Sequence, residues 1–119
     1  MDAKRTKRIR RHKRIRRKVL GQPHCPRLCV YRGLSGLSAQ LIDDINKKTL
    51  ISISTEDKQF KKKTPYGGNV QAAKLLGVIF AERAKNKKIK KVIFDRAGFL
   101  FHGRIKAFAE SCREQGLEF

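Results

Sequence analysis

The first eighteen residues are too basic to join a hydrophobic core, so the rest of the chain has to build the fold. Eleven of them are Lys or Arg, and within residues 4–18 only Ile9 and Ile15 are apolar. Such a segment buries too little apolar surface to offset its loss of conformational entropy, so we expect it to stay disordered until a polyanion neutralises it. A glycine and two prolines follow. We therefore predict a basic tail at residues 1–20 and one domain at residues 21–119.

The whole chain carries a large positive excess, with 30 Lys and Arg against 10 Asp and Glu for a net charge of +20. A charge of this size favours a large anionic partner, and nucleic acid fits best. The chain contains no run of about 18 apolar residues that could cross a membrane. No apolar segment follows the basic start, as one would in a secretory signal. An organellar transit peptide is an alternative that the lack of an amphipathic stripe disfavours.

Three β-rich runs separated by turn-forming residues predict an antiparallel meander. They cover residues 26–32, 37–44 and 48–55. In the third run, alternation places Thr49, Ile51, Ile53 and Thr55 on one face and Leu50, Ser52 and Ser54 on the other. One face of the sheet should therefore be apolar and the other small and hydroxylated.

Two helices and a fourth strand complete the predicted domain. Asn69 can cap a helix whose small and apolar residues recur at helical spacing; these are Val70, Ala73, Gly77, Phe80, Ala81 and Ala84. Residues 91–95 should form a strand buried on both faces and parallel to its neighbour. The inner stripe of the second helix is Ile105, Phe108, Ala109 and Cys112, and Gly116 should end it with Leu117 folding back. The prediction is a single compact α/β domain in the order βββαβα, whose mixed sheet combines an antiparallel meander with one parallel strand and is covered by two helices.

The segment FDRAGFLFHGR, residues 94–104, concentrates polar side chains between glycines and phenylalanines. An enzyme would pair Asp95 with His102, but no nucleophile motif and no spaced carboxylates support that role, so we expect no catalytic residue. Cations at a helix start are unfavourable beside the macrodipole unless an anion joins them. We therefore predict a phosphate pocket at Gly103, with Arg104 forking onto phosphate oxygens and Asp95 orienting Arg96 or Arg104.

The first helix repeats this arrangement, because three lysines, a tyrosine and two glycines lead into its cap. Neither helix offers an Arg, Asn and Gln face suited to base edges in DNA, so structured RNA fits better. Tyr31, Tyr66 and Phe60 are available for base stacking, and of these we expect only Tyr66 to be exposed.

Three cysteines without a secretion signal indicate reduced thiols. A zinc site would recruit His24 or His102 around Cys25 and Cys29, but their spacing lacks the paired ligands of a structural zinc site. We expect Cys25, Cys29 and Cys112 to be small buried residues, and no metal or cofactor.

Several stretches make the chain resemble the large-subunit ribosomal protein eighteen family, the bacterial-type binders of 5S ribosomal RNA. They are PRLCVYRG, AQLIDD, KTLISIST, GGNVQAAKLLG, VIFDRAGFLFHGRIKAFAESCRE and the final GLEF. The resemblance implies a structural component of the large ribosomal subunit, without catalytic activity. It would bind 5S ribosomal RNA and help attach it to 23S ribosomal RNA in the central protuberance.

The resemblance also implies RNA contacts at five places. They are the tail cations Lys4, Arg5, Lys7, Arg8, Arg10, Arg11, Lys13, Arg14, Arg16, Arg17 and Lys18; Arg32 and Gly33; Ser52, Ser54 and Thr55; Lys61, Lys62, Lys63, Tyr66, Gly67, Gly68 and Asn69; and His102, Gly103 and Arg104. The implied partners are 5S and 23S ribosomal RNA and neighbouring large-subunit proteins, in a cytoplasmic or organellar ribosome. We expect no membrane, small-molecule substrate or self-association.

Two other functions stay open at this point. One is a metal-dependent nuclease that uses Asp95, Asp43 or Asp44, and His102. The other is a polybasic protein of the membrane surface, bound to anionic lipid through its tail.

Overall fold

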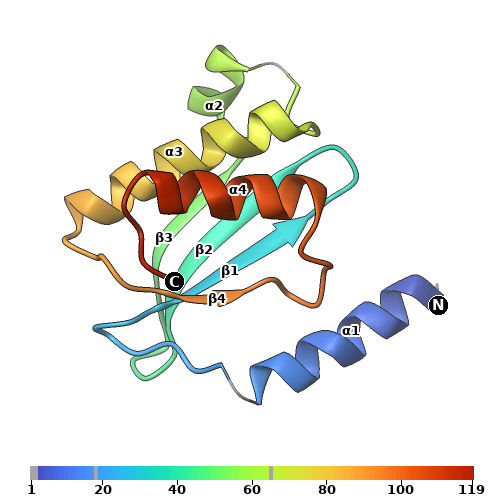
Figure 1. Ribbon diagram of the computed structural model, residues 1–119, viewed down its shortest axis with the longest axis vertical. Helices are drawn as coiled ribbons and strands as arrows, with labels where there is room; N and C mark the ends of the chain where they lie inside the picture. Colours follow the sequence, from blue (N-terminus) through green and yellow to red (C-terminus); the bar gives the residue numbers. More distant parts are fainter. Residues whose placement is uncertain (1–2, 18, 65) are drawn as a thin grey trace.

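A computed structural model of the chain describes residues 3–17, 19–64 and 66–119. Its elements are α1 (Ala3–Arg16), β1 (Arg27–Arg32), β2 (Leu37–Asp43), β3 (Lys48–Ser54), α2 (Lys58–Lys63), α3 (Val70–Asn86), β4 (Ile93–Asp95) and α4 (Gly103–Glu114). The strands form one sheet in the order β3-β2-β1-β4 (Figure 1). β1 and β3 both pair antiparallel with β2, whereas β4 runs parallel to β1. The predicted mixed sheet is confirmed.

Helices α3 and α4 lie side by side across one face of the sheet (Figure 1). That face is apolar because alternate strand residues such as Val30, Leu41 and Ile53 point into the core. The helices approach closely at Gly77, where an added Cβ would lie 2.8 Å from the carbonyl oxygen of Phe108. β4 is shorter than predicted. Its Asp95 is fully buried, but Ile93 and Phe94 are only partly buried, so the prediction of a strand buried on both faces is wrong.

The ends of the two long helices follow the predicted local chemistry. The Asn69 side chain accepts a hydrogen bond from the backbone N–H of Ala72 at 2.8 Å and caps α3. At the carboxyl end of α4, Gly116 has a φ of +107°, and the Leu117 N–H donates to the carbonyl of Cys112 at 3.1 Å. This backbone arrangement is a Schellman motif, as the glycine predicted.

The largest difference from prediction is at the amino terminus, where residues expected to be disordered form helix α1. Three of its side chains, spaced to share one helical face, reach groups at the end of β4 and just after it. Arg8 donates to the carbonyl of Ala97 at 2.9 Å, and Arg11 donates to that of Gly98 at 2.8 Å. His12 Nε2 lies 3.1 Å from the carboxylate of Asp95. Helix α1 is therefore held by polar contacts, which a search for apolar periodicity does not detect.

A second unpredicted helix, α2, lies within the lysine-rich segment after β3. It forms because Phe60 anchors it to the core with 2% of its surface exposed, so Phe60 is not available to stack on a base. No helix in the described residues is long and apolar enough to cross a membrane. Lys18 lies outside the described residues.

Candidate nucleic-acid interface

Helices α3 and α4 both begin at the same end of the sheet, next to the loop between β1 and β2 (Figure 1). Arg104, in the first turn of α4, donates to the carbonyl oxygens of Gly33 at 2.9 Å and Gly36 at 3.1 Å. Burial, followed by repulsion from Arg32, lowers the pKa of Arg104. Because both terminal nitrogens of its guanidinium already have acceptors, Arg104 holds the loop in place. This arrangement replaces the predicted fork onto a phosphate.

The start of α4 is open to an anion. His102 occupies the cap position without a side-chain capping bond, and the first turn contains no acidic residue. Gly103 has a φ of +57°, and nothing lies within 4 Å of the place where a Cβ would stand. The backbone at Gly103 is therefore sterically open, which would let an anion approach the helix start.

The start of α3 is less open. Gly67 is buried, and a Cβ there would lie 2.5 Å from the Cβ of Thr55. Thr55 is 1% exposed, and its hydroxyl accepts a hydrogen bond from the Leu37 N–H at 3.0 Å. Both residues therefore lie below the surface and serve internal packing, contrary to their predicted contact with RNA. Tyr66 is 56% exposed, as predicted, but Tyr31 is 49% exposed, so the prediction that Tyr66 alone would be exposed is wrong.

The three lysines of α2 do not stand at the start of α3. Lys62 and Lys63 line a groove beside the second half of α3, together with Ile79 and Arg83. Lys61 forms an exposed salt bridge of 3.0 Å with Glu56. The predicted basic loop is therefore wrong for these lysines, which belong to helix α2, and only its tyrosine and glycines lead into α3.

A cationic groove between α1 and the rest of the molecule was not predicted. Its lining is Lys4, Arg5, Lys7, Arg8, Arg11, Tyr31, Arg32, Phe99, Leu100 and His102. Within the described residues, no acidic side chain lines it. The Arg8 guanidinium lies 4.6 Å from the centre of the Phe99 ring, and the Arg32 guanidinium lies 5.3 Å from the same centre. Basic side chains interleaved with aromatic rings suit phosphates and bases together.

The sheet face opposite α3 and α4 is polar. Ser38 pairs with Ser54, and Gln40 pairs with Ser52, so four hydrogen-bonding side chains lie next to one another on this face. Gln40 and Ser52 are exposed, and the two other serines are partly exposed. The predicted positions of Ser52 and Ser54 are confirmed. Ser38 and Gln40 were missed, although the same alternation in β2 would have found them.

Asp95 holds α1 in place and does not orient Arg96 or Arg104 as predicted. One oxygen accepts a hydrogen bond from Arg27 at 2.7 Å and lies near His12, and the other accepts the Ala97 N–H at 2.9 Å. Burial alone raises the pKa of Asp95, but the bonds from Ala97, His12 and Arg27 outweigh it and lower the pKa.

The three aspartates named for the alternative nuclease already have partners within the protein. Asp44 is bound by Arg27 at 3.0 Å. Asp43 accepts hydrogen bonds from the side chain and backbone of Asn46, and the side-chain bond is the main cause of its lowered pKa. Asp95 is buried beneath α1. These three carboxylates therefore bind other groups of the protein, which argues against a role in holding the metal ions of a nuclease.

Ligand atoms of His12, Cys29 and Asp95 lie within 4.8 Å of one another, a spacing that a metal ion could bridge. The Arg27 guanidinium already binds the Asp95 oxygen that faces His12, and its charge would repel a dication. Burial raises the pKa of Cys29 to about 11, which keeps the thiol protonated at neutral pH. The group therefore serves to anchor α1. Of the three cysteines only Cys112 is fully buried, so the expectation of three buried thiols is only partly met.

The basic residues of α1 divide into two sets. Arg8, Arg11 and Arg16 reach acceptors within the protein. The exposed set is Lys4, Arg5, Lys7, Arg10, Lys13 and Arg14, followed by Arg17 after the helix. Docking therefore uses a minority of the cations and leaves the others on the surface.

Fold and surface together define a class: a small, strongly basic α/β protein with a groove and a polar sheet face suited to a polyanion. Residues 2–119 match the family model described as "Ribosomal L18 of archaea, bacteria, mitoch. and chloroplast". The chain belongs to this family of ribosomal proteins, which is not known to contain enzymes.

Curated relatives agree along almost the whole length. The chain is 54% identical to "Large ribosomal subunit protein uL18" of Aquifex pyrophilus over 121 residues, covering all of this chain and 98% of the relative. It is 49% identical to the protein of the same name from Thermotoga petrophila over 118 residues, covering 99% of this chain and 97% of the relative. It is 52% identical to the protein of the same name from Acetivibrio thermocellus over 112 residues, covering 94% of this chain and 92% of the relative.

An Arg104→Ala substitution should release the loop between β1 and β2. We expect hydrogen exchange at residues 33–36 to accelerate, because each charged hydrogen bond that holds the loop contributes about 1.5–3 kcal/mol. RNA affinity should fall about 10-fold, because the loop that carries Gly33 is no longer fixed. Arg104→Lys should rescue only part of the effect, since one ammonium cannot match the planar fork. Unchanged exchange at the loop would contradict the positioning role.

Proposed function

We propose that this protein is a structural component of the large ribosomal subunit that binds 5S ribosomal RNA. It helps attach that RNA to 23S ribosomal RNA in the central protuberance, beside neighbouring subunit proteins. It acts bound to the ribosome, in the cytoplasm. Family membership supports the ribosomal role, and the names of the relatives support the large subunit.

The cationic groove is the observation that carries this proposal. Its Lys and Arg side chains come from α1 and β1, His102 at the start of α4 adds an imidazole, and the rings of Tyr31 and Phe99 also line it. The two rings meet edge to face, with their centres 5.3 Å apart. This surface fits the irregular backbone and unstacked bases of a folded RNA better than a flat array of charges would.

The groove, the polar sheet face and the start of α4 supply the contacts in this mechanism. Docking α1 on the body removes part of the entropy cost that a disordered arm would meet on binding. Residues 1–20 then act as an RNA-binding arm beside the domain formed by residues 21–119. Arg104 acts indirectly, by fixing the loop that carries Gly33.

The identity of the RNA tests the proposal directly. Tagged protein would be recovered from a ribosome-depleted extract, and the RNA that accompanies it would be sequenced. Enrichment of 5S ribosomal RNA over transfer RNA of comparable abundance is the expected result. A mixture that follows RNA abundance would indicate a non-specific polycation and reject the proposal.

Affinity should depend steeply on salt. If about 6 to 10 phosphates are neutralised, affinity for 5S ribosomal RNA should fall roughly 10³ to 10⁵ fold between about 50 and 200 mM salt. Filter-binding titrations in potassium chloride measure the slope. A complex whose affinity is nearly independent of salt would show that phosphate contacts do not dominate.

A further inference from the structure

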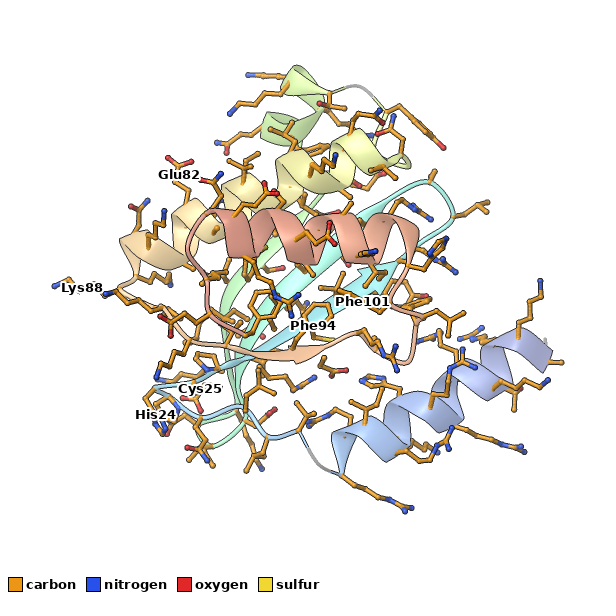
Figure 2. The ribbon with its side chains drawn as sticks, in the orientation of Figure 1. His24, Cys25, Glu82, Lys88, Phe94 and Phe101 are labelled. Atoms are coloured by element: carbon orange, nitrogen blue, oxygen red, sulfur yellow. The ribbon has the colours of Figure 1, made fainter. Side chains whose placement is uncertain are left out.

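Five lysines lie at the end of α3 and in the segment that follows it, away from the cationic groove. This lysine cluster consists of Lys85, Lys87, Lys88, Lys90 and Lys91, and all five are exposed. Figure 2 places Lys88 at the far side of the molecule from α1. In Figure 1, α3 ends at the side opposite the starts of α3 and α4. A ligand that fills the groove therefore leaves this cluster uncovered.

We propose that the lysine cluster is a second RNA-binding surface, which holds a different RNA segment from the one in the cationic groove. The inference rests on the proposed function and extends it, because a protein with two separated basic surfaces can join two RNA segments. The molecule measures 35 Å along each of its two longer axes, which is enough to keep the two surfaces apart.

Helix electrostatics account for only part of the cluster. Lysines in the last turn of a helix complement the negative end of its macrodipole, and this effect fades beyond that turn. Lys85 fits this explanation, and Lys87 and Lys88 follow directly after the helix. Lys90 and Lys91 lie further along, next to β4, where the dipole gives no reason for positive charge.

The backbone ends helix α3 at Lys88. Lys88 has a φ of +61° and ends α3 in a Schellman motif, in which the Ile89 N–H donates to the carbonyl of Ala84 at 2.9 Å. Glycine is the residue that fits this position without strain. The positive φ of Lys88 therefore belongs to the helix ending, where Lys85, Lys87 and Lys88 are all exposed.

The surroundings of the cluster favour a phosphate backbone as its partner. None of the five lysines enters a salt bridge in the part of the chain that the structure describes. The large exposed apolar residues of the described chain lie elsewhere, at Leu34, Tyr66 and Leu100 among others. Protein interfaces and membrane insertion both use apolar or aromatic anchors, whereas sequence-independent RNA binding needs mainly cations.

A two-RNA capture experiment tests the inference. Biotinylated 5S ribosomal RNA is fixed to beads and saturated with the full-length protein, and fluorescent fragments of large-subunit ribosomal RNA are then added. The test variant combines Lys85→Gln, Lys88→Gln and Lys90→Gln. The matched control combines Lys47→Gln, Lys48→Gln and Lys74→Gln, which removes the same charge and also alters one lysine with a positive φ, Lys47.

We expect the test variant to bind 5S ribosomal RNA within about 2-fold of the wild type while capturing at least about 5-fold less of the second RNA. Its capture should also lose about 2 to 3 units of salt slope, roughly one for each phosphate contact removed. The control should behave as the wild type in both steps. Thermal melting of all three proteins verifies that each one is folded.

Each other result would overturn the inference. Equal capture by the test variant and the wild type, or no capture by the wild type, would show that the cluster holds no second RNA. A parallel loss in both steps would show one continuous RNA surface. Failure of the wild type to bind 5S ribosomal RNA in the first step would reject the proposed function and this extension with it.

Discussion

Replacing Asp95 by Ala should destabilise the protein by about 3 kcal/mol, because removing one partner of a buried ion pair leaves the charge of the other, here Arg27, without this counter-ion. Asp95 is 0% exposed and accepts hydrogen bonds from Arg27 and from the backbone N–H of Ala97. His12 Nε2 lies 3.1 Å from the same carboxylate. Arg27 keeps its bonds to Asp44, which holds the loss near the lower end of the usual range. Urea unfolding of the wild type and variant measures the difference.

Asp95→Asn provides the matched control. It keeps the shape and the acceptor for Ala97 while removing the charge, so a smaller loss is expected. The depressed pKa of Asp95 stabilises the protein at pH values above 3.8, the ordinary value, and this contribution is lost as the pH falls through the folded-state pKa. The Asn variant should therefore show a weaker decline in stability on acidification. An Ala variant within 0.5 kcal/mol of wild type, an estimate typical of neutral surface changes, would refute the anchoring role.

Deleting residues 1–17 should weaken binding to 5S ribosomal RNA about 10³-fold at low salt and remove most of its salt dependence. The reason is that the arm supplies five of the groove's cations and the further exposed ones along α1. The domain should still fold, since no residue of α1 is fully buried. Fluorescence titration of labelled RNA and circular dichroism of the protein give the two measurements.

The control for charge lost elsewhere on the surface is the variant with Lys47, Lys48 and Lys74 changed to Gln, which removes three positive charges outside the arm. We expect its affinity to lie within about 2-fold of wild type at a fixed salt concentration. If the truncated protein failed to fold, the division between arm and domain near residue 20 would be wrong. If it folded and bound RNA as tightly as the wild type, the groove would not be the RNA site.

Local chemistry made much of the fold predictable. The meander follows from alternation, and the cap at Asn69 and the stop at Gly116 each depend on residues within a few positions. The parallel pairing of β4 with β1 follows from the helical crossover. These features need no knowledge of distant partners.

The docking of α1 and the role of Arg104 were missed because they depend on polar contacts between distant residues. Arg8 and Ala97 are 89 positions apart, and Arg27 and Asp95 are 68 apart. Nothing in the spacing of either pair indicates that they meet. The same holds for Arg104, whose carbonyl partners lie in a loop between two strands. Sequence reasoning therefore found the open start of α4 but not the groove that α1 forms beside it.

The turn at Ala97 and Gly98 has a consequence for studying the arm. Both residues have positive φ, and the Phe99 N–H closes the turn on the Arg96 carbonyl at 3.0 Å. A methyl group at Gly98 would overlap the carbonyl oxygen of Arg8 and lie 2.9 Å from the backbone nitrogen of His12. A Gly98→Ala substitution would thus displace α1 from the domain without removing any charge from the chain. The geometry of attachment could then be separated from the number of cations that the arm carries.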